Sequence, residues 1–417
     1  IRSAGPPPTA ASARCRPEPV VAIDAERLLA DLDALRRIGR DRTGVHRPAL
    51  GEADMAARRW VAERMRAADL APTMDGVGNV LGRGAGTAPA LLIGSHTDSV
   101  PHGGWLDGAL GVAYGLEIAR AVAAGAPDLA GRIDVVDFQD EEGTFHPCLG
   151  SRAAVGALAP DTLADQRDTD GRRFGDERAA HELAATPCPP LDTGRYRAFL
   201  EAHIEQGPRL EQAGLDVGVV TGIVGIRRYA VAATGRADHA GTTPMAVRRD
   251  AGQALLRLAP RLLDTVARAA GADTVWNIGR IAFTPGAANV VPAEAELTLE
   301  VRDPDTARLD AIEAALAQLM DGAQLVDGAD AGDGAVSWRR TAVIEPVSMN
   351  PGVADALVAA AAARGASSLR LASGAGHDAM ILARTCRRRC CSSPASAVAA
   401  TTCRRTPSPR TSCAAAG

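Results

Sequence analysis

The chain of 417 residues contains no lysine, and all 46 of its basic residues are arginine. This absence excludes Schiff-base chemistry on a lysine amine and the phosphate-binding P-loop, because both need that side chain. It also indicates a GC-rich gene. The net charge of -4 leaves no basic footprint for nucleic acid, and no apolar run reaches membrane-spanning length. We therefore expect neither a nucleic-acid partner nor a membrane.

Cysteine is scarce over most of the chain, and only Cys15, Cys148 and Cys188 precede residue 385. The remaining cysteines crowd residues 385–417. Residues 1–20 are rich in proline and alanine and lack the apolar stretch of a signal peptide, and nothing else indicates secretion. We expect a cytoplasmic protein with reduced thiols, two or three domains, and a disordered segment over residues 1–20.

Two short apolar strands alternate with helical patterns in the first part of the chain. Residues 90–94 and 133–138 are expected to be buried strands, whereas residues 25–37, 52–68 and 110–124 carry apolar positions at the spacing of helices. Alternating strands and helices are typical of α/β layer structures. Ligands in such sheets bind at the carboxyl ends of the strands.

A different pattern begins near residue 226. Residues 229–233 and 293–302 are expected to be strands, and residues 245–269, with a kink at Pro260, and 306–320 are expected to be helices. This order suggests a small sheet covered by two helices and inserted into the first domain. The predicted domains are a catalytic, metal-binding domain over 21–225 and 339–384, an inserted domain over 226–338, and an aberrant tail over 385–417.

Four segments combine imidazole and carboxylate groups: Gly94–Asp98, Leu106–Gly111, Asp140–Gly143 and Glu201–Gly207. Imidazole nitrogen and carboxylate oxygen are ligands that suit zinc, manganese, cobalt or nickel. A pair of such ions can turn water into a nucleophile near neutral pH. The combination predicts a metal-dependent hydrolase.

The positions of the residues in these segments favour particular chemical roles. Asp107 can bridge two ions because a carboxylate has two oxygens. Asp98 is placed to hydrogen-bond the second ring nitrogen of His96 and so fix its tautomer. Glu141 and Glu142 are adjacent, so one is expected to bind metal and the other to act as a base. Singly, such patterns are usually turns or solvated acidic patches; their joint occurrence after predicted strands favours a site.

This ordered set resembles a family of binuclear-metal amidohydrolases that includes N-carbamoyl-L-amino-acid hydrolase, allantoate amidohydrolase and β-ureidopropionase, within the zinc aminopeptidase-like superfamily. The resemblance runs from about Leu28 to Arg384. His203 stands where the peptidase branch usually has an acid, which favours the carbamoylase branch. The strings Asp238–Met245 and Gly286–Pro292 resemble motifs of that branch's lid. The implied fold is an α/β, zinc-aminopeptidase-like catalytic domain with an inserted α+β lid and dimerisation domain.

The resemblance also implies two divalent metal ions per subunit, which would be zinc, manganese, cobalt or nickel. His96, Asp107 and His203 would hold one ion, and Asp107 and Glu142 the second. Glu141 would be the general base that activates water.

Further residues would bind a small-molecule substrate. Gln206, Asn289, Arg302 and His377 are implied as substrate ligands, with Arg302 pairing a carboxylate through its planar fork. His239 would reach the active site of the partner subunit and stabilise the oxyanion, which implies a homodimer. From the residues alone, Arg302 could equally form a surface ion pair, and His377 could be an ordinary loop residue.

The tail over residues 385–417 departs from this pattern, with six arginines, no acid and no helical or strand period. One interpretation is a disordered tail. Another comes from codons: shifted by one base, GC-rich codons for the stretch that begins with residues 385–391 can encode His-Val-Pro-Ala-Ala-Met-Leu-Phe. The continued shifted frame gives a turn and an acidic helix start, which resembles the family's last metal-ligand segment. We therefore expect a frameshift that removes a histidine ligand of the second ion, a core strand and a helix.

The predicted function is metal-dependent hydrolysis of a carbamoyl or ureido C–N bond in a carboxylate-bearing substrate, with release of ammonia and carbon dioxide. The tail makes the activity of this chain doubtful. Two alternatives remain open, namely an aminoacylase or dipeptidase of the same superfamily and a catalytically dead homologue that only binds or oligomerises.

Overall fold

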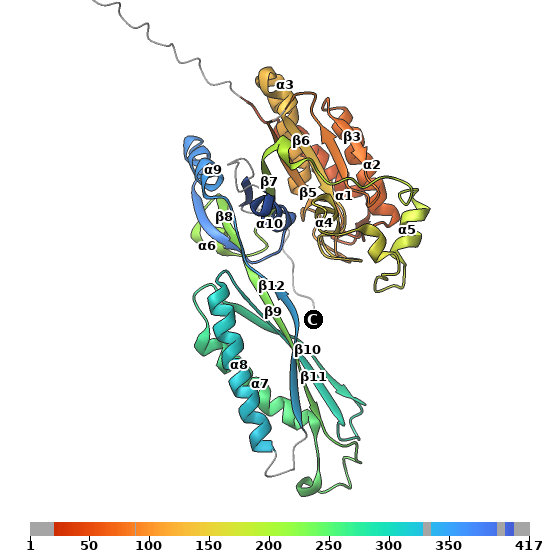
Figure 1. The fold of residues 1–417 in the computed structure, drawn as a ribbon, viewed down its shortest axis with the longest axis vertical. Coiled ribbons are helices and arrows are strands. Elements are labelled where there is room, and N and C mark those ends of the chain that lie inside the picture. The colour runs from red at the N-terminus through yellow and green to blue at the C-terminus, as the bar shows by residue number, and fades with distance from the viewer. Residues whose placement is uncertain (1–20, 88, 328–334, 390–396, 404–417) are drawn as a thin grey trace, which may run out of the picture.

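The structure, a computed structural model, describes residues 21–87, 89–327, 335–389 and 397–403. The segment predicted to be disordered, residues 1–20, lies outside them. The chain forms two units, which we call the body and the lid, joined end to end in an elongated molecule (Figure 1). It passes from the body into the lid at Val224 and returns through Glu345 and Pro346.

The body is built on a mixed sheet. Its strands are β3 (Ala71–Met74), β4 (Val80–Arg83), β5 (Ala90–His96), β6 (Ile133–Phe138), β7 (Tyr196–Ile204), β8 (Val217–Ile223), β13 (Val347–Ser348), β14 (Ser368–Ser373) and β15 (Ala397–Cys403), and a separate ribbon pairs β1 (Arg40–Asp41) with β2 (Gly44–Val45). The order is β13-β8-β15-β7-β5-β6-β4-β3, and β14 pairs with β8. Strands β5, β6, β7 and β15 are parallel, so their carboxyl ends meet at one edge.

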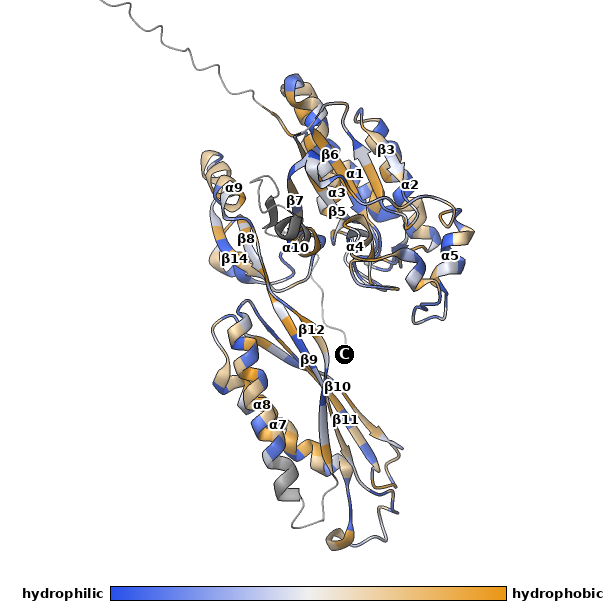
Figure 2. Cartoon of the chain, in the orientation of Figure 1, coloured by the Kyte–Doolittle hydropathy of each residue, from blue (hydrophilic) through white to orange (hydrophobic). Residues whose placement is uncertain are grey.

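Helices cover both faces of this sheet. They are α1 (Ala25–Arg37), α2 (Glu52–Arg66), α3 (Ala109–Gly125), α4 (Leu149–Ala154), α5 (Phe174–Ala180), α6 (Arg209–Ala213), α9 (Pro351–Ala363) and α10 (Asp378–Arg389). Because successive strand residues face opposite ways, Ile93 and Val135 pack with α1, α2 and α3. Leu92 and Val136 pack on the other side with α4 and α10. Figure 2 shows hydrophobic colouring along the central strands of this sheet.

The lid is an antiparallel sheet in the order β10-β11-β9-β12, formed by β9 (Gly225–Thr234), β10 (Val275–Thr284), β11 (Glu294–Asp303) and β12 (Val336–Ile344). Helices α7 (Ala251–Ala269) and α8 (Thr306–Asp327) lie on one face. Strict alternation along β11 buries Leu297 and Leu299 against these helices, whereas β10 is mostly exposed. No described helix of either unit is long and apolar enough to cross a membrane.

The helix expected over residues 245–269 begins later than its apolar pattern suggested. Met245–Val247 form a short 3-10 turn, and α7 starts at Ala251. Asp250 sets this start, because its carboxylate accepts the N–H of Gln253 at 3.0 Å and so caps the helix. Pro260 lies within α7, which continues past it.

The tail contains more regular structure than its sequence suggested. Helix α10 extends to Arg389, and residues 397–403 form β15, which pairs with β7 in parallel and with β8 in antiparallel. The expectation that the body lacks this strand is therefore wrong. The physical reason is that Ala-Val-Ala-Ala-Thr-Thr is small and β-branched, a composition that a sheet accepts. Residues 390–396 and 404–417 lie outside the described residues.

Candidate active site

Three side chains that the sequence analysis selected meet at the carboxyl edge of the body sheet. His96 ends β5, His203 lies near the end of β7, and Asp107 precedes α3. The Nε2 atom of His203 lies 2.9 Å from Oδ1 of Asp107. One ligand atom from each of the three residues lies within 4.8 Å of the others. In the part of the chain that the structure describes, this is the only group of three or more such ligands at that spacing.

The ring nitrogens of both histidines are set for metal binding. Nδ1 of His96 lies 3.1 Å from the backbone oxygen of Asp98, and Nδ1 of His203 lies 2.9 Å from that of Ile204. A carbonyl oxygen only accepts, so each Nδ1 donates, and loss of the proton on Nε2 leaves the Nδ1–H tautomer. Both rings are buried, at 1% and 2% exposure. This tautomer is the one in which Nε2 binds zinc and its neighbours in the transition series.

Gly108 explains how Asp107 comes so close to His96. Its φ is +60°, a left-handed conformation that favours glycine. A Cβ atom at this position would lie 2.5 Å from the His96 ring. The backbone therefore passes over the imidazole only because residue 108 has no side chain.

Asp98 contacts both the His96 ring and the acidic turn. Its carboxylate lies 3.6 Å from Nδ1 of His96, and its backbone oxygen lies closer, at 3.1 Å. The carboxylate also accepts the N–H groups of Glu141 and Glu142, at 3.3 and 3.2 Å. Arg58 approaches the same carboxylate at 3.6 Å. Burial opposes the ionised form, yet His96 and Arg58 lower the pKa of Asp98. The residue thus fixes the acidic turn next to His96.

Glu141 and Glu142 follow β6 and face the histidine cluster. Oε2 of Glu141 lies 3.6 Å from Nε2 of His96. Burial raises the pKa of Glu141 well above its usual value, and the neighbouring Asp378 and Glu142 add to the rise while His96 opposes it. Burial and the charge of Asp107 also raise the pKa of Glu142. A carboxylate with a raised pKa is suited to accept a proton near neutral pH.

Glu201 was not selected from the sequence, yet it ties three elements to the site. From β7 it accepts the hydroxyl of Ser95 on β5 at 2.7 Å and the N–H of Ala379 on α10 at 2.8 Å. The second bond caps α10 directly after His377. The ring centroids of His377 and His203 consequently lie 4.4 Å apart.

His377 is buried and held by one further polar contact. Its Nε2 lies 2.9 Å from the hydroxyl of Ser373. Burial lowers the pKa of His377 well below its usual value, and the neighbouring His203 and His96 lower it further. The ring is therefore neutral and can exchange hydrogen bonds with a ligand.

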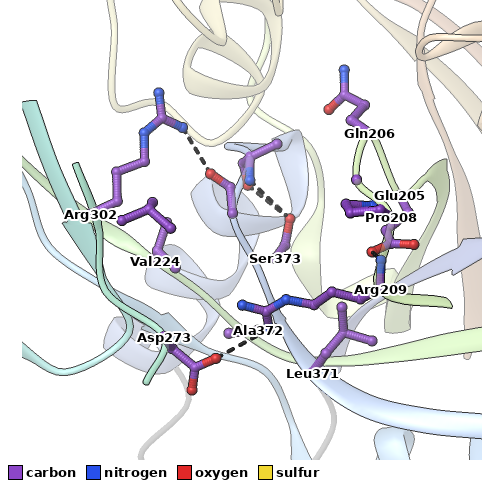
Figure 3. A pocket seen from close by; sticks show the side chains of 14 residues that line it. Glu205, Gln206, Pro208, Arg209, Val224, Asp273, Arg302, Leu371, Ala372 and Ser373 are labelled. Carbon is purple, nitrogen blue, oxygen red and sulfur yellow. Dashed lines mark hydrogen bonds and ion pairs between the residues drawn. The ribbon is translucent and has the colours of Figure 1, made fainter. Parts of the chain in front are cut away.

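Gln206 and Arg302 border a cavity of about 370 Å³ between body and lid (Figure 3). The amide of Gln206 donates to Oδ2 of Asp107 at 2.8 Å. Arg302 contacts Glu300 at 2.7 Å and donates to the backbone oxygen of Gly374 at 2.8 Å. These bonds use some of the five N–H groups of the guanidinium and leave others for a ligand.

Comparison with known proteins agrees with this geometry. A profile of Peptidase family M20/M25/M40 matches residues 92–399. An N-carbamoyl-L-amino-acid amidohydrolase of Paenarthrobacter aurescens is 35% identical over 379 residues, which cover 86% of this chain and 88% of that protein. The chain belongs to this family.

Two further comparisons show similarity of this M20-family enzyme to amidohydrolases. An allantoate amidohydrolase of Escherichia coli (strain K12) is 35% identical over 328 residues, covering 77% of this chain and 78% of that protein. An amidase of the hydantoinase/carbamoylase family from Burkholderia phymatum has a crystal structure that matches with a TM-score of 0.82 at 43% identity, covering 93% of this chain and 92% of that one. The predicted family, fold class and amidohydrolase activity are thereby confirmed.

The M20-family chain does not bring His239 and Asn289 to the cluster. Both side chains are exposed. They follow the ends of β9 and β10 that lie away from the body, where the N–H of Ala240 donates to the backbone oxygen of Asn289 at 3.0 Å. Arg302 lies at the opposite end of β11, eight residues from Glu294 in the register, which corresponds to roughly 27 Å. Within one chain, the predicted site is therefore divided.

Proposed function

We propose that this amidohydrolase cleaves the carbamoyl C–N bond of an N-carbamoyl-L-amino acid, or the corresponding ureido bond of allantoate. The observation that carries the proposal is the set of His96, Asp107 and His203, whose ligand atoms lie within 4.8 Å of one another, with Nε2 of His96 3.6 Å from Glu141. The names of the relatives supply the bond type. The substrate is a small molecule.

The donor set fits two divalent ions. His96, Asp107 and His203 would hold one ion, and Asp107 together with Glu142 would contribute to the other. Such ligands suit zinc, manganese, cobalt or nickel. When bound, the ions supply Lewis acidity and make water a stronger nucleophile near neutral pH.

Different residues of the chain transfer the proton and bind the substrate. Glu141 accepts the proton of the attacking water and delivers it to the nitrogen that leaves. The C–N bond breaks as that nitrogen is protonated, and the carbamic acid released decomposes to ammonia and carbon dioxide. Neutral His377 and the amide of Gln206 hydrogen-bond the substrate, and Arg302 pairs with its carboxylate.

The divided site supports a homodimer. His239 and Asn289 would complete the active site of the partner subunit, where His239 stabilises the oxyanion. Strand β10 is an edge of the lid sheet and exposes Trp276, Ile281 and Phe283 at 37%, 45% and 38%. An exposed apolar edge strand favours pairing with another copy of itself. Residues 226–338 would then act as lid and dimerisation domain.

The sequence of the tail affects the binding of the second ion. The sequence has no histidine after His377, so a frameshift near Arg384 would remove one ligand of that ion. We expect this chain to bind the second ion weakly. A gene with one base restored at the Arg384 codon should give about two ions per subunit and higher activity. Plasma mass spectrometry of both proteins measures this, and equal metal content would reject the frameshift.

The function is tested by ammonia release from metal-loaded protein supplied with N-carbamoyl-L-amino acids or allantoate. N-acetyl amino acids and dipeptides run in parallel. Turnover of a carbamoyl or ureido compound supports the proposal. Turnover of only the acetyl compounds or dipeptides would favour the aminoacylase or dipeptidase alternative. No turnover by a frame-restored protein with full metal content would favour a dead homologue.

A further inference from the structure

The cavity between body and lid adjoins the candidate active site through two hydrogen bonds. Gln206 lines it and donates to Asp107, and Ser373 lines it and contacts His377 at 2.9 Å. Arg302 borders the same space (Figure 3). A substrate that places its carboxylate on Arg302 and its carbamoyl group at the metal ligands would direct the side chain on its α-carbon into this cavity.

Much of the wall of this cavity is apolar. Val224, Leu371 and Ala372 line it from the body, and Val275 lines it from the lid. Val275 is 51% exposed and lines this partly open cavity. An apolar side chain left uncovered inside a pocket indicates a ligand that covers it. The wall therefore matches an aliphatic group.

The charges at the other end of the cavity are satisfied by one another. Arg209 of the body and Asp273 of the lid form an ion pair at 3.1 Å. Glu205 accepts the N–H groups of Arg209 and Leu210 at 2.7 and 3.0 Å. These exposed charges are already paired with one another, so they add little attraction for a charged ligand group.

We propose that this cavity is a side-chain site that selects N-carbamoyl-L-amino acids with aliphatic side chains, of the size of valine to leucine, over allantoate. The proposal rests on the proposed function. Allantoate carries a second ureido group, which needs several hydrogen-bond partners. Gln206, which bonds Asp107, and His377, which contacts Ser373, are engaged by the carbamoyl group that both substrates share, so the second ureido group would face the apolar wall. An isobutyl group instead covers Val275 and Leu371.

The direct test compares kcat/KM for N-carbamoyl derivatives of glycine, alanine, valine and leucine with that for allantoate, using metal-loaded full-length protein. We expect a rise of roughly tenfold or more from the glycine to the leucine derivative, because a methylene in an apolar pocket changes specificity by about 10-fold or more. Allantoate should be slower than the leucine derivative. Calorimetric binding of the same compounds should follow the same order, so weak turnover does not prevent the comparison.

Val275→Asn with Val343→Asn as control sharpens the test. Both valines are exposed on strands of the lid sheet, at 51% and 44%, and only Val275 lines the cavity. Val275→Asn should lower the leucine-to-glycine ratio of kcat/KM, or of binding constants, by roughly tenfold. Val343→Asn should preserve the ratio. A ratio cancels any general loss of folded or metal-loaded protein.

The outcomes separate this proposal from the function on which it rests. A flat series, a preference for allantoate, or equal effects of the two variants would overturn the side-chain site and leave amide hydrolysis in place. Metal-loaded protein that neither binds nor turns over any carbamoyl or ureido compound would overturn the proposed function, and with it this inference.

Discussion

The metal-ligand cluster of the body and the far end of the lid carry residues predicted for one reaction, yet they differ in every physical respect. His96 and His203 are buried on parallel strands, and each ring is fixed by a backbone oxygen. His239 and Asn289 are exposed on loops. Nδ1 of His239 accepts the local N–H of Gly241 at 3.1 Å. Folding of one chain therefore fixes the orientation of His96 and His203. His239 and Asn289 do not face the active site of their own chain.

The difference teaches which parts of the site are preorganised. Groups that bind ions and activate water must hold their geometry before substrate arrives, and burial among strand ends provides that. Groups that stabilise charge later in the reaction can be supplied by a second subunit. The following experiments test this division, from the largest expected effect to the smallest.

The strongest test removes the base from the preorganised half. Glu141→Gln keeps the shape and loses proton transfer, so kcat should fall by roughly 10²–10⁴-fold while metal content stays near that of the parent. Glu26→Gln, an exposed carboxylate on α1, is the control and should behave as the parent. Near-normal turnover by fully metal-loaded Glu141→Gln protein would remove Glu141 from this role.

The second test asks whether the exposed half acts across subunits. His239→Ala alone should lose roughly 10²–10³-fold in kcat, the usual cost of one oxyanion donor. Mixed with Glu141→Gln and allowed to exchange subunits, it should recover roughly a quarter of parental activity, because half of random dimers contain one site without either lesion. Native mass spectrometry verifies exchange. Hybrids that form without recovered activity would show that His239 serves its own subunit.

The third test separates the subunits. Ile281→Arg places a charge on the exposed edge strand β10, so it should give monomers and lower activity roughly a hundredfold at low protein concentration. Val343→Arg makes the same change on β12, the opposite edge of the sheet, at similar exposure of 44% against 45%. It should remain dimeric. Sedimentation and activity on dilution measure both, and matching behaviour would exclude β10 as the interface.

The smallest expected effect belongs to the end of the lid that touches the body. Arg302→Lys keeps the charge but loses the planar fork, so KM for carboxylate substrates should rise roughly tenfold with little change in kcat. Arg280→Lys is the matched control, since Arg280 forms a similar pair with Glu296 at 3.0 Å on the neighbouring strand. If both variants keep the parental KM, Arg302 is a structural ion-pair residue.

Sequence patterns predicted the residues of the cluster because His96 and His203 stand at strand ends and Asp107 stands before a helix, where local order and resemblance agree. They assigned the carboxylate of Asp98 to the His96 ring, whereas the backbone oxygen of Asp98 lies closer to the same ring nitrogen, at 3.1 Å against 3.6 Å. They missed Glu201, whose partners Ser95 and Ala379 are 106 and 178 residues away. No local pattern contains bonds over such distances.

The sequence patterns also failed to reveal two strands, β10 and β15. β10 has mostly exposed residues and therefore lacks the alternation that revealed β11. β15 lies in a segment of odd composition, and only its neighbours β7 and β8 identify it as a strand. In both cases the tertiary context, and not the segment itself, determines the structure.

Gly108 also constrains how this enzyme can be redesigned. Gly171 and Gly214 share its left-handed backbone, but no atom lies within 4 Å of the place that a Cβ would take there, so asparagine would cost only backbone strain. At Gly108 even alanine would displace the imidazole beneath it. A library randomised at the three positions should therefore yield several residues at 171 and 214, and glycine alone at 108 among variants that still bind metal.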